Sequence, residues 1–229
     1  MADIQMNQMT LSFWTTSSVE KIQWNHLSIT YPGVHLLPHQ SDQYYSEWTI
    51  LCSWNDDVDD INNTILEKFS GNPKVFHSAD SIPNNHGDRQ DGILMYPVEY
   101  FNSINCSSLP LAKLTLKIGC PAMILWNLNA SEGVCNGSQG IITRIGNHCQ
   151  VLKVQLLTGE QAGQTIFIPH ISLTPTDTQI PFEFCQRQFP ICLSFAMTIN
   201  KSQGQSVKHV GLNLCNLVFA HGQLYVAVS

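Results

Sequence analysis

The chain of 229 residues is poor in charge and especially poor in arginine. Charged residues make up only 12% of it, where an ordinary soluble domain carries about 25%. The arginines are Arg89, Arg144 and Arg187, and the formal net charge is -6. A protein that binds a nucleic-acid backbone on its own is normally basic, because it needs several Lys or Arg contacts to phosphate. If this chain binds nucleic acid, we expect another segment or partner to contribute.

The sequence also lacks the marks of secreted and membrane proteins. Its 8 cysteines include no C-x-x-C pair and are too sparse for a disulfide scaffold, so we expect reduced thiols. The longest nearly apolar run, at 120–126, is far shorter than the roughly 18 residues of a membrane-spanning helix. The first ten residues show no signal-peptide pattern. These absences favour an intracellular protein with no membrane partner.

Self-contained catalysis is not indicated either. The phosphate loop G-x-x-x-x-G-K-[ST] is missing, because Lys201 is preceded by Asn200 and not by glycine, and no Asp-Glu dipeptide is present to hold magnesium. Neither His148–Cys149 nor His170 has the spacing of a zinc site. No G-x-S-x-G sequence is present. We therefore expect no catalytic residue and no metal site among these residues.

What the chain does have is 43% hydrophobic residues, enough for a sizeable core. Residues 1–46 show no clear period and are expected to be loop with some helix. A strand is predicted at 48–53, followed by a helix from about 55 that ends before Gly71. The helix would bury one face made by Val58, Ile61, Ile65, Leu66 and Phe69.

Four aspartates, at positions 56, 57, 59 and 60, open this helix. Carboxylates in the first turns are stabilised by unpaired N–H groups and by the helix dipole. We interpret the four as capping the helix, and a metal site is the less favoured alternative.

A β-rich stretch separates two α/β parts. Residues 79–93 are predicted to be an exposed loop that leads to a short helix near 97–104. Short apolar runs between turns then follow from 114 to 173, which is typical of a small antiparallel barrel or meander. A strand-like run at 191–199 and a strand at 208–214 resume the α/β pattern, so the barrel is predicted to be an insert.

The polar segment TINKSQG, residues 198–204, follows the apolar run ICLSFAMTI. At the carboxyl end of an α/β strand, the Thr198, Asn200, Lys201 and Ser202 side chains and the Gly204 backbone can offer hydrogen-bond donors to phosphate. On the residues alone, an ordinary polar strand-to-helix turn is the favoured alternative, and phosphate binding is the less favoured one.

Several strings in this sequence together resemble one family, the PIF-type DNA helicases, including those of Helitron transposons. They are ILCSWNDDVDDINNTIL, FHSADSI, IFIPHISLTP, TINKSQGQS and HGQLYVAVS, together with the long run from YPVEYFNSI to GIITRI, and they extend over roughly 45–229. The resemblance implies an α/β fold: an incomplete second RecA-like domain interrupted by a small Src-homology-type β-barrel. The implied division is an unassigned segment at 1–46, RecA-like parts at 47–96 and 176–229, and the barrel at 97–175.

For function, the resemblance implies part of an ATP-dependent helicase that moves five-prime to three-prime on single-stranded DNA. Such enzymes serve repair, recombination, telomere or transposon maintenance in the nucleus or mitochondria. Thr198, Asn200, Lys201 and Ser202 match motif V and would face DNA phosphates, while Gln203 and Gly204 would lie near the nucleotide. ATP and magnesium would bind the complete enzyme and not this chain alone. The partners would be single-stranded DNA and a first RecA-like domain.

Some residues depart from the family pattern. Trp54, Trp126 and Gln139 stand where relatives often carry arginine, and the arginine that continues motif VI is not among these residues. We therefore expect no activity from the chain alone. Two alternatives remain open: a non-enzymatic module that binds single-stranded nucleic acid or protein through the barrel and Trp126, and a decayed transposon remnant.

Overall fold

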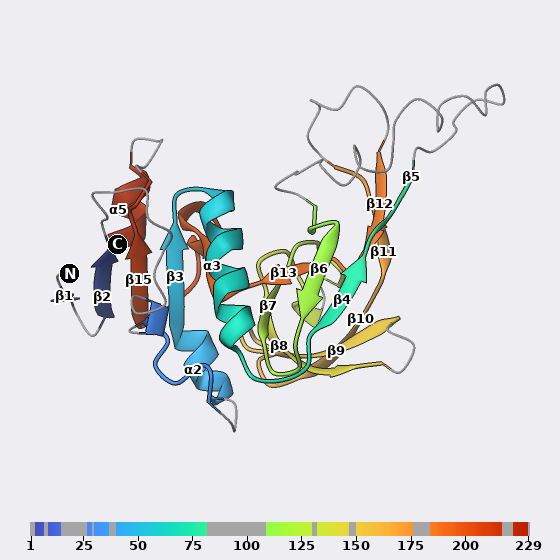
Figure 1. Ribbon diagram of the computed structural model, residues 1–229, viewed down its shortest axis with the longest axis horizontal. Helices are drawn as coiled ribbons and strands as arrows, with labels where there is room; N and C mark the ends of the chain where they lie inside the picture. The colour runs from blue at the N-terminus through green and yellow to red at the C-terminus, as the bar shows by residue number, and fades with distance from the viewer. Residues whose placement is uncertain are drawn as a thin grey trace.

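The computed structural model describes residues 3–6, 9–14, 27–28, 30–36, 40–81, 109–129, 132–146, 150–175, 184–216 and 222–228, the first two ranges as backbone only. Figure 1 shows a sheet at one end of the molecule, a group of shorter strands at the other, and the helix α3 between them. No helix in this described part is long and apolar enough to cross a membrane.

The α/β part contains a five-stranded sheet with the order β1-β2-β15-β3-β14. Strands β2, β15, β3 and β14 are parallel neighbours, and β1 pairs with β2 in an antiparallel hairpin. The bounds are β1 Asp3–Met6, β2 Met9–Trp14, β3 Trp48–Cys52, β14 Ala196–Thr198 and β15 His209–Asn213. The expectation of loop with some helix for 1–46 is therefore wrong at β1 and β2. Strand β2 pairs with β15 and β1 pairs with β2, and this pairing, rather than a local period, makes them strands.

The helix α3 (Asn55–Lys68) packs on this sheet as its periodicity predicted. Its buried residues include Ile61, Ile65 and Leu66, which share a core cluster with Ile50 and Cys52 of β3. The opposite face of β3 presents Leu51 to a second cluster with β15 and with α5 (Gln223–Val228). A short helix, α2 (Asp42–Glu47), leads into β3. Alternate residues of β3 therefore point to opposite layers, as in a sheet covered on both faces.

The second group of strands surrounds the other end of the core. One sheet has the order β10-β9-β8-β7-β13, and two smaller ones pair β4 with β6 and join β11, β12 and β5. All these pairings are antiparallel. The bounds are β4 Lys74–His77, β5 Ala79–Ser81, β6 Lys113–Leu116, β7 Pro121–Ile124, β8 Gln139–Ile145, β9 Val151–Leu156, β10 Thr165–Pro169, β11 Ile171–Leu173, β12 Cys185–Gln188 and β13 Ile191–Leu193. The predicted antiparallel barrel or meander is therefore present.

The predicted single strand ICLSFAMTI is wrong in one respect, because it divides into two strands of different sheets. Residues Ile191–Leu193 pair with β7, whereas Ala196–Thr198 pair with β3. Ser194 and Phe195 make the crossing, with the Ser194 amide donating to Pro121 (3.2 Å) and the Phe195 carbonyl accepting from Ile50 (3.1 Å). Each short strand completes a neighbouring sheet, and tertiary pairing overrides the continuous apolar run.

Part of the predicted loop 79–93 is also a strand, since Ala79–Ser81 form β5. The rest of that loop and the expected helix at 97–104 lie outside the described residues.

Candidate nucleic-acid interface

The TINKSQG segment lies at the carboxyl edge of the parallel sheet. Thr198 ends β14 opposite Cys52, which ends β3. The chain then forms a short 3-10 helix, η3 (Ile199–Ser202), and turns at Gly204 with φ +80°. That backbone conformation favours glycine, because a Cβ would be strained there. Ligands of open parallel sheets bind at this edge, so the fold places the segment where a site is expected.

Within the segment, the predicted DNA-contacting residues are not equally available. Asn200 is exposed and Lys201 is half-buried, while Thr198 is 9% exposed. The Ser202 hydroxyl donates to the Ile199 carbonyl at 2.7 Å. Since that bond uses its only proton, Ser202 cannot also donate to a phosphate in this conformation. Asn200 and Lys201 are the available donors.

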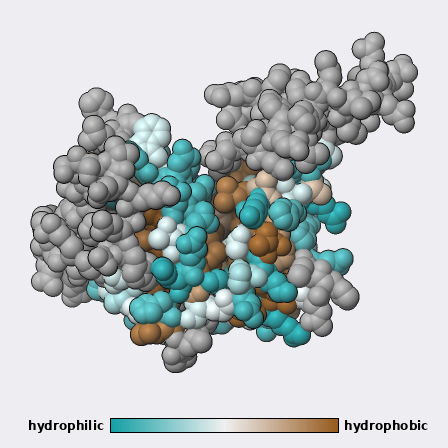
Figure 2. Space-filling model, in the orientation of Figure 1, coloured by the Kyte–Doolittle hydropathy of each residue, from teal (hydrophilic) through white to brown (hydrophobic). Residues whose placement is uncertain are grey.

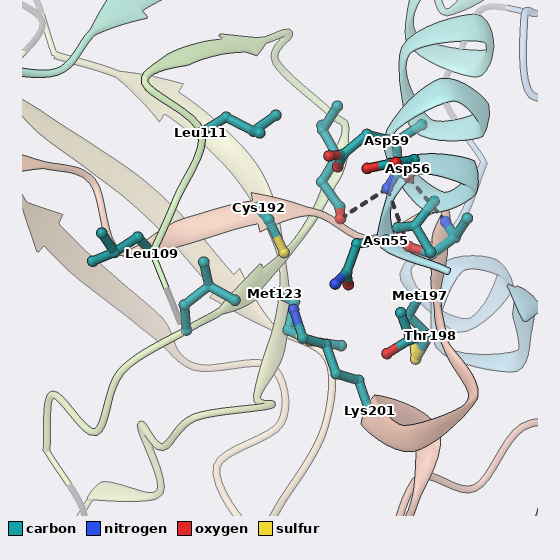
Figure 3. Close-up of a pocket in the computed structure, with 15 residues that line it drawn as sticks. Asn55, Asp56, Asp59, Leu109, Leu111, Met123, Cys192, Met197, Thr198 and Lys201 are labelled. Carbon is teal, nitrogen blue, oxygen red and sulfur yellow. Dashed lines mark hydrogen bonds between the residues drawn. The ribbon is translucent and has the colours of Figure 1, made fainter. Parts of the chain in front are cut away.

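A cavity of about 240 Å³ opens beside this segment, between α3, β14 and the barrel strands. In Figure 3, Lys201 and Thr198 lie on one side of it, Asp56 and Asp59 on another, and Leu109 and Leu111 opposite. Figure 2 shows apolar surface exposed among hydrophilic side chains at the junction of α3 and the barrel. The residues that line the cavity are Asn55, Asp56, Val58, Asp59, Asn62, Leu109, Leu111, Met123, Leu125, Cys192, Leu193, Ala196, Met197, Thr198 and Lys201.

The charges in the cavity are one cation and two carboxylates. Burial raises the pKa of Asp59, the negative charge of Asp56 raises it further, and the positive charge of Lys201 opposes both effects. Among the described residues, neither carboxylate forms a salt bridge; the ion pair found in that part of the chain joins Lys208 to Glu47. Asp59 is therefore a partly dehydrated acceptor, and a ligand carrying N–H donors would stabilise its charged form.

The thiol of Cys192 also lines the cavity. Burial raises its pKa, with Lys201 acting in the opposite direction, so the group stays a neutral thiol at physiological pH. A neutral thiol is a poor nucleophile and behaves as a small apolar surface.

Asn62 fixes the wall of the cavity where the two sheets meet. Its amide nitrogen donates to the carbonyls of Leu193 (3.3 Å) and Ala196 (3.1 Å), and its oxygen accepts from the Ala196 amide at 2.9 Å. The side chain is 4% exposed. One residue of α3 thereby satisfies backbone groups on both sides of the crossing from β13 to β14.

A second link joins the TINKSQG segment to the barrel. The Gln205 side-chain amide donates to the Gly137 carbonyl at 3.0 Å, and Gln139 donates to the Gln205 oxygen at 3.4 Å. Gln139, one of the departures expected from the resemblance, is buried and bonds to Gln205 rather than facing solvent.

The remaining predicted residues lie apart from the cavity. Gln203 and Gly204 are exposed at the turn, which leaves their expected place near a nucleotide a prediction. Trp54 is 47% exposed at the start of α3, and Trp126 is half-buried just after β7. His170 stacks on Phe189 at 3.7 Å between ring centroids.

The aspartates lie at the start of α3, as the sequence predicted. The N-cap residue is Trp54, so none of the four occupies the cap position itself, but Asp56 and Asp57 lie in the first turn, where the helix dipole favours a negative charge. Asp57 also accepts from Asn216 at 2.7 and 3.0 Å. Asp59 faces the cavity, and no group of three His, Cys, Asp or Glu that could hold a metal occurs among the described residues. The spacing of Asp56 and Asp59, one helical turn apart, was the available signal.

The comparisons with known proteins agree with this architecture. A family model described as "DNA helicase Pif1, 2B domain" matches residues 99–145. The chain is similar to the ATP-dependent DNA helicase PIF1 of Homo sapiens, with 30% identity over 182 residues that cover 79% of this chain and 25% of that protein. The chain thus spans about a quarter of the length of that relative.

Solved structures are similar in fold. The Pif1 helicase from Candida albicans matches with a TM-score of 0.57 and 18% identity, covering 89% of this chain and 50% of that one. The Pif1 helicase from Bacteroides in complex with ADP-AlF3 and ssDNA matches with a TM-score of 0.54 and 23% identity, covering 90% and 43%. The expected α/β fold, RecA-like with a small β-rich insert, is confirmed.

Proposed function

We propose a function for this chain from the premise that it belongs to the PIF-type DNA helicases. It forms the second RecA-like domain, with its β-barrel insert, of an ATP-dependent enzyme that moves five-prime to three-prime on single-stranded DNA. The placement of Lys201 and Asn200 at the carboxyl edge of the parallel sheet carries this proposal.

The DNA-binding role follows from what the segment offers. Lys201 supplies a positive charge and Asn200 an exposed amide, and phosphate contacts of this kind position a strand without reading its sequence. Thr198 contributes a hydroxyl at the cavity margin, and Ser202 holds the turn through its bond to Ile199. With a net charge of -6, the chain should bind a single strand weakly on its own and more tightly beside a first RecA-like domain.

In this proposal, the nucleotide is bound jointly by this domain and by the first RecA-like domain. The 229 residues contain no phosphate loop and no Asp-Glu pair. Gln203 and Gly204, exposed beside η3, fit a role in which this domain closes on a nucleotide held by another domain. ATP with magnesium would supply the phosphoryl-transfer energy in the complete enzyme, and the chain by itself should not hydrolyse it.

For the domain boundaries, strand pairing favours a wider insert than 97–175. Strand β4 pairs with β6, and β13 pairs with β7, so the paired strands extend from Lys74 to Leu193. We place the RecA-like parts on either side of those strands. Roles in repair, recombination, telomere or Helitron maintenance, and a nuclear or mitochondrial location, are expectations from the family.

The test is fluorescence anisotropy of labelled oligothymidine of about twenty nucleotides, titrated with the chain over a range of salt concentrations. Lys201→Ala should weaken binding several-fold and reduce the salt slope by about 0.7, the value for one lost phosphate contact on a single strand. The matched control is Lys208→Ala, which removes the same charge at the opposite edge of the sheet, where Lys208 pairs with Glu47.

Binding that falls with salt, weakens in Lys201→Ala and stays unchanged in Lys208→Ala would support the proposal. Equal losses in the two variants, or no binding by protein that melts cooperatively, would contradict it.

A further inference from the structure

We propose that the cavity beside Lys201 receives one unpaired base of the bound strand and prefers guanine. The inference rests on the proposed DNA binding by the TINKSQG segment and adds base recognition to it. Its basis is the combination of a small cavity, apolar walls and an open carboxylate in one place.

The size of the cavity suits one aromatic ring system. Its volume is about 240 Å³, below the roughly 300–1,000 Å³ of pockets that hold drug-sized ligands. A whole nucleotide triphosphate would not fit, whereas a single base entering from the backbone side would. Lys201 and Thr198 stand at that side, where the phosphates of the same strand would pass.

The walls match the two faces of a base. Leu109 and Leu111 lie on the barrel side, Met197 lies toward the parallel sheet, and Met123 lines the cavity between them in this view. Proteins that hold an unpaired base pack apolar or aromatic side chains against its faces and read its edge with hydrogen bonds. Leucine and methionine suit this packing because methionine adapts its shape to what it contacts.

The polar side chains of the cavity match the hydrogen-bonding edge of guanine better than the edges of the other three bases. Asp59 and Asp56 accept hydrogen bonds, and Lys201 donates them. Guanine presents two adjacent N–H donors, at N1 and N2, beside the acceptor O6. One carboxylate can therefore take both donors while the lysine reaches O6. Adenine and cytosine present a single amino group, and thymine offers one N–H between two carbonyls, which would face a carboxylate.

The state of Asp59 supports this assignment. It is partly buried on α3 and forms no hydrogen bond or salt bridge with the described residues, so its acceptor sites are open. Asp60, its neighbour in sequence, is exposed and does not line the cavity. The two aspartates differ in environment while sharing charge and helix, and Asp60 therefore provides a matched control.

The experiment compares two labelled oligonucleotides of about twenty nucleotides: one of thymidine only, and one in which guanosine replaces every fourth thymidine, so that no two guanines are adjacent. Wild-type chain should bind the guanosine-containing strand about tenfold more tightly. Asp59→Asn should remove that preference while leaving or slightly raising affinity for oligothymidine, since it deletes a negative charge. Asp60→Asn should raise affinity for both strands equally and keep the preference.

The possible results either support or overturn the proposed base site. A wild-type preference lost in Asp59→Asn and kept in Asp60→Asn supports the base site. Equal affinity for the two strands, or a preference that survives Asp59→Asn, overturns it while leaving the proposed DNA binding intact. No binding of either strand by folded chain overturns both.

Discussion

The parallel-sheet region and the barrel region are encoded in the sequence in different ways. Helix α3 buries Ile61 and Ile65 at the spacing of its own turns, so a local pattern defines it. The barrel depends on pairings between distant strands, and β8 against β9 even shifts register between Ile142 and Arg144. Yet Ile65 of α3 and Ile142 of β8 belong to the same core cluster. Two differently encoded regions therefore share one interior and should fold as one unit.

The largest expected effect tests that shared interior. Ile65→Ala and Ile142→Ala each remove a side chain that is 0% exposed, which costs about 2–5 kcal/mol in free energy of unfolding. If the regions form one unit, both variants should shift a single denaturant transition by similar amounts, monitored by tryptophan fluorescence and far-UV circular dichroism. Two separate transitions, each sensitive to one variant only, would show that the regions are independent.

The junction itself is tested by Asn62→Ala. The change leaves the Ala196 amide and the carbonyls of Leu193 and Ala196 without their partner, and a buried unpaired group costs about 1–3 kcal/mol. A matched control is Asn63→Ala, an exposed neighbour on the same helix, which should change stability little. Equal effects of the two substitutions in a urea titration would contradict a special role for Asn62.

A smaller effect is expected at the second link between the regions. Gln205→Ala removes the bond to Gly137 and the partner of Gln139. Both hydrogen bonds are only partly buried, so we expect a loss of about 0.5–1.5 kcal/mol in free energy of unfolding. A double variant that also carries Gln139→Ala tests the contact between the two side chains. It should lose less stability than the sum of the losses in the two single variants, because both substitutions remove the same contact. Strict additivity in thermal or chemical unfolding would show that the two side chains act separately.

The smallest effect is electrostatic and confined to the parallel-sheet region. Hydrogen bonds from Lys208, and then from Gln43, lower the pKa of Glu47 below its ordinary value of 4.5. A group with a lowered pKa in the folded state contributes stability above its unfolded pKa and loses it as the pH falls through the folded value. The difference in free energy of unfolding between wild type and Lys208→Ala should therefore be constant above pH 4.5. It should shrink as the pH falls below that value. A difference that grows at low pH would contradict this assignment.

The sequence by itself determined the elements whose signals are local. The strand β3, the one-sided apolar period of α3 and the strand β15 were all predicted from their own residues, and the TINKSQG segment with its neighbours identified the family. These features could be predicted because each depends on side chains only a few positions apart.

Tertiary structure alone decided the rest. Strand β2 pairs with the distant strand β15, and β1 pairs with β2. The run from Ile191 to Thr198 divides because its first part pairs with β7 in one sheet and its last part pairs with β3 in another. In the same way Asp59 faces a cavity only because the barrel stands across from α3. Such pairings join residues far apart in the chain, and no local period records which distant strand will be available as a partner.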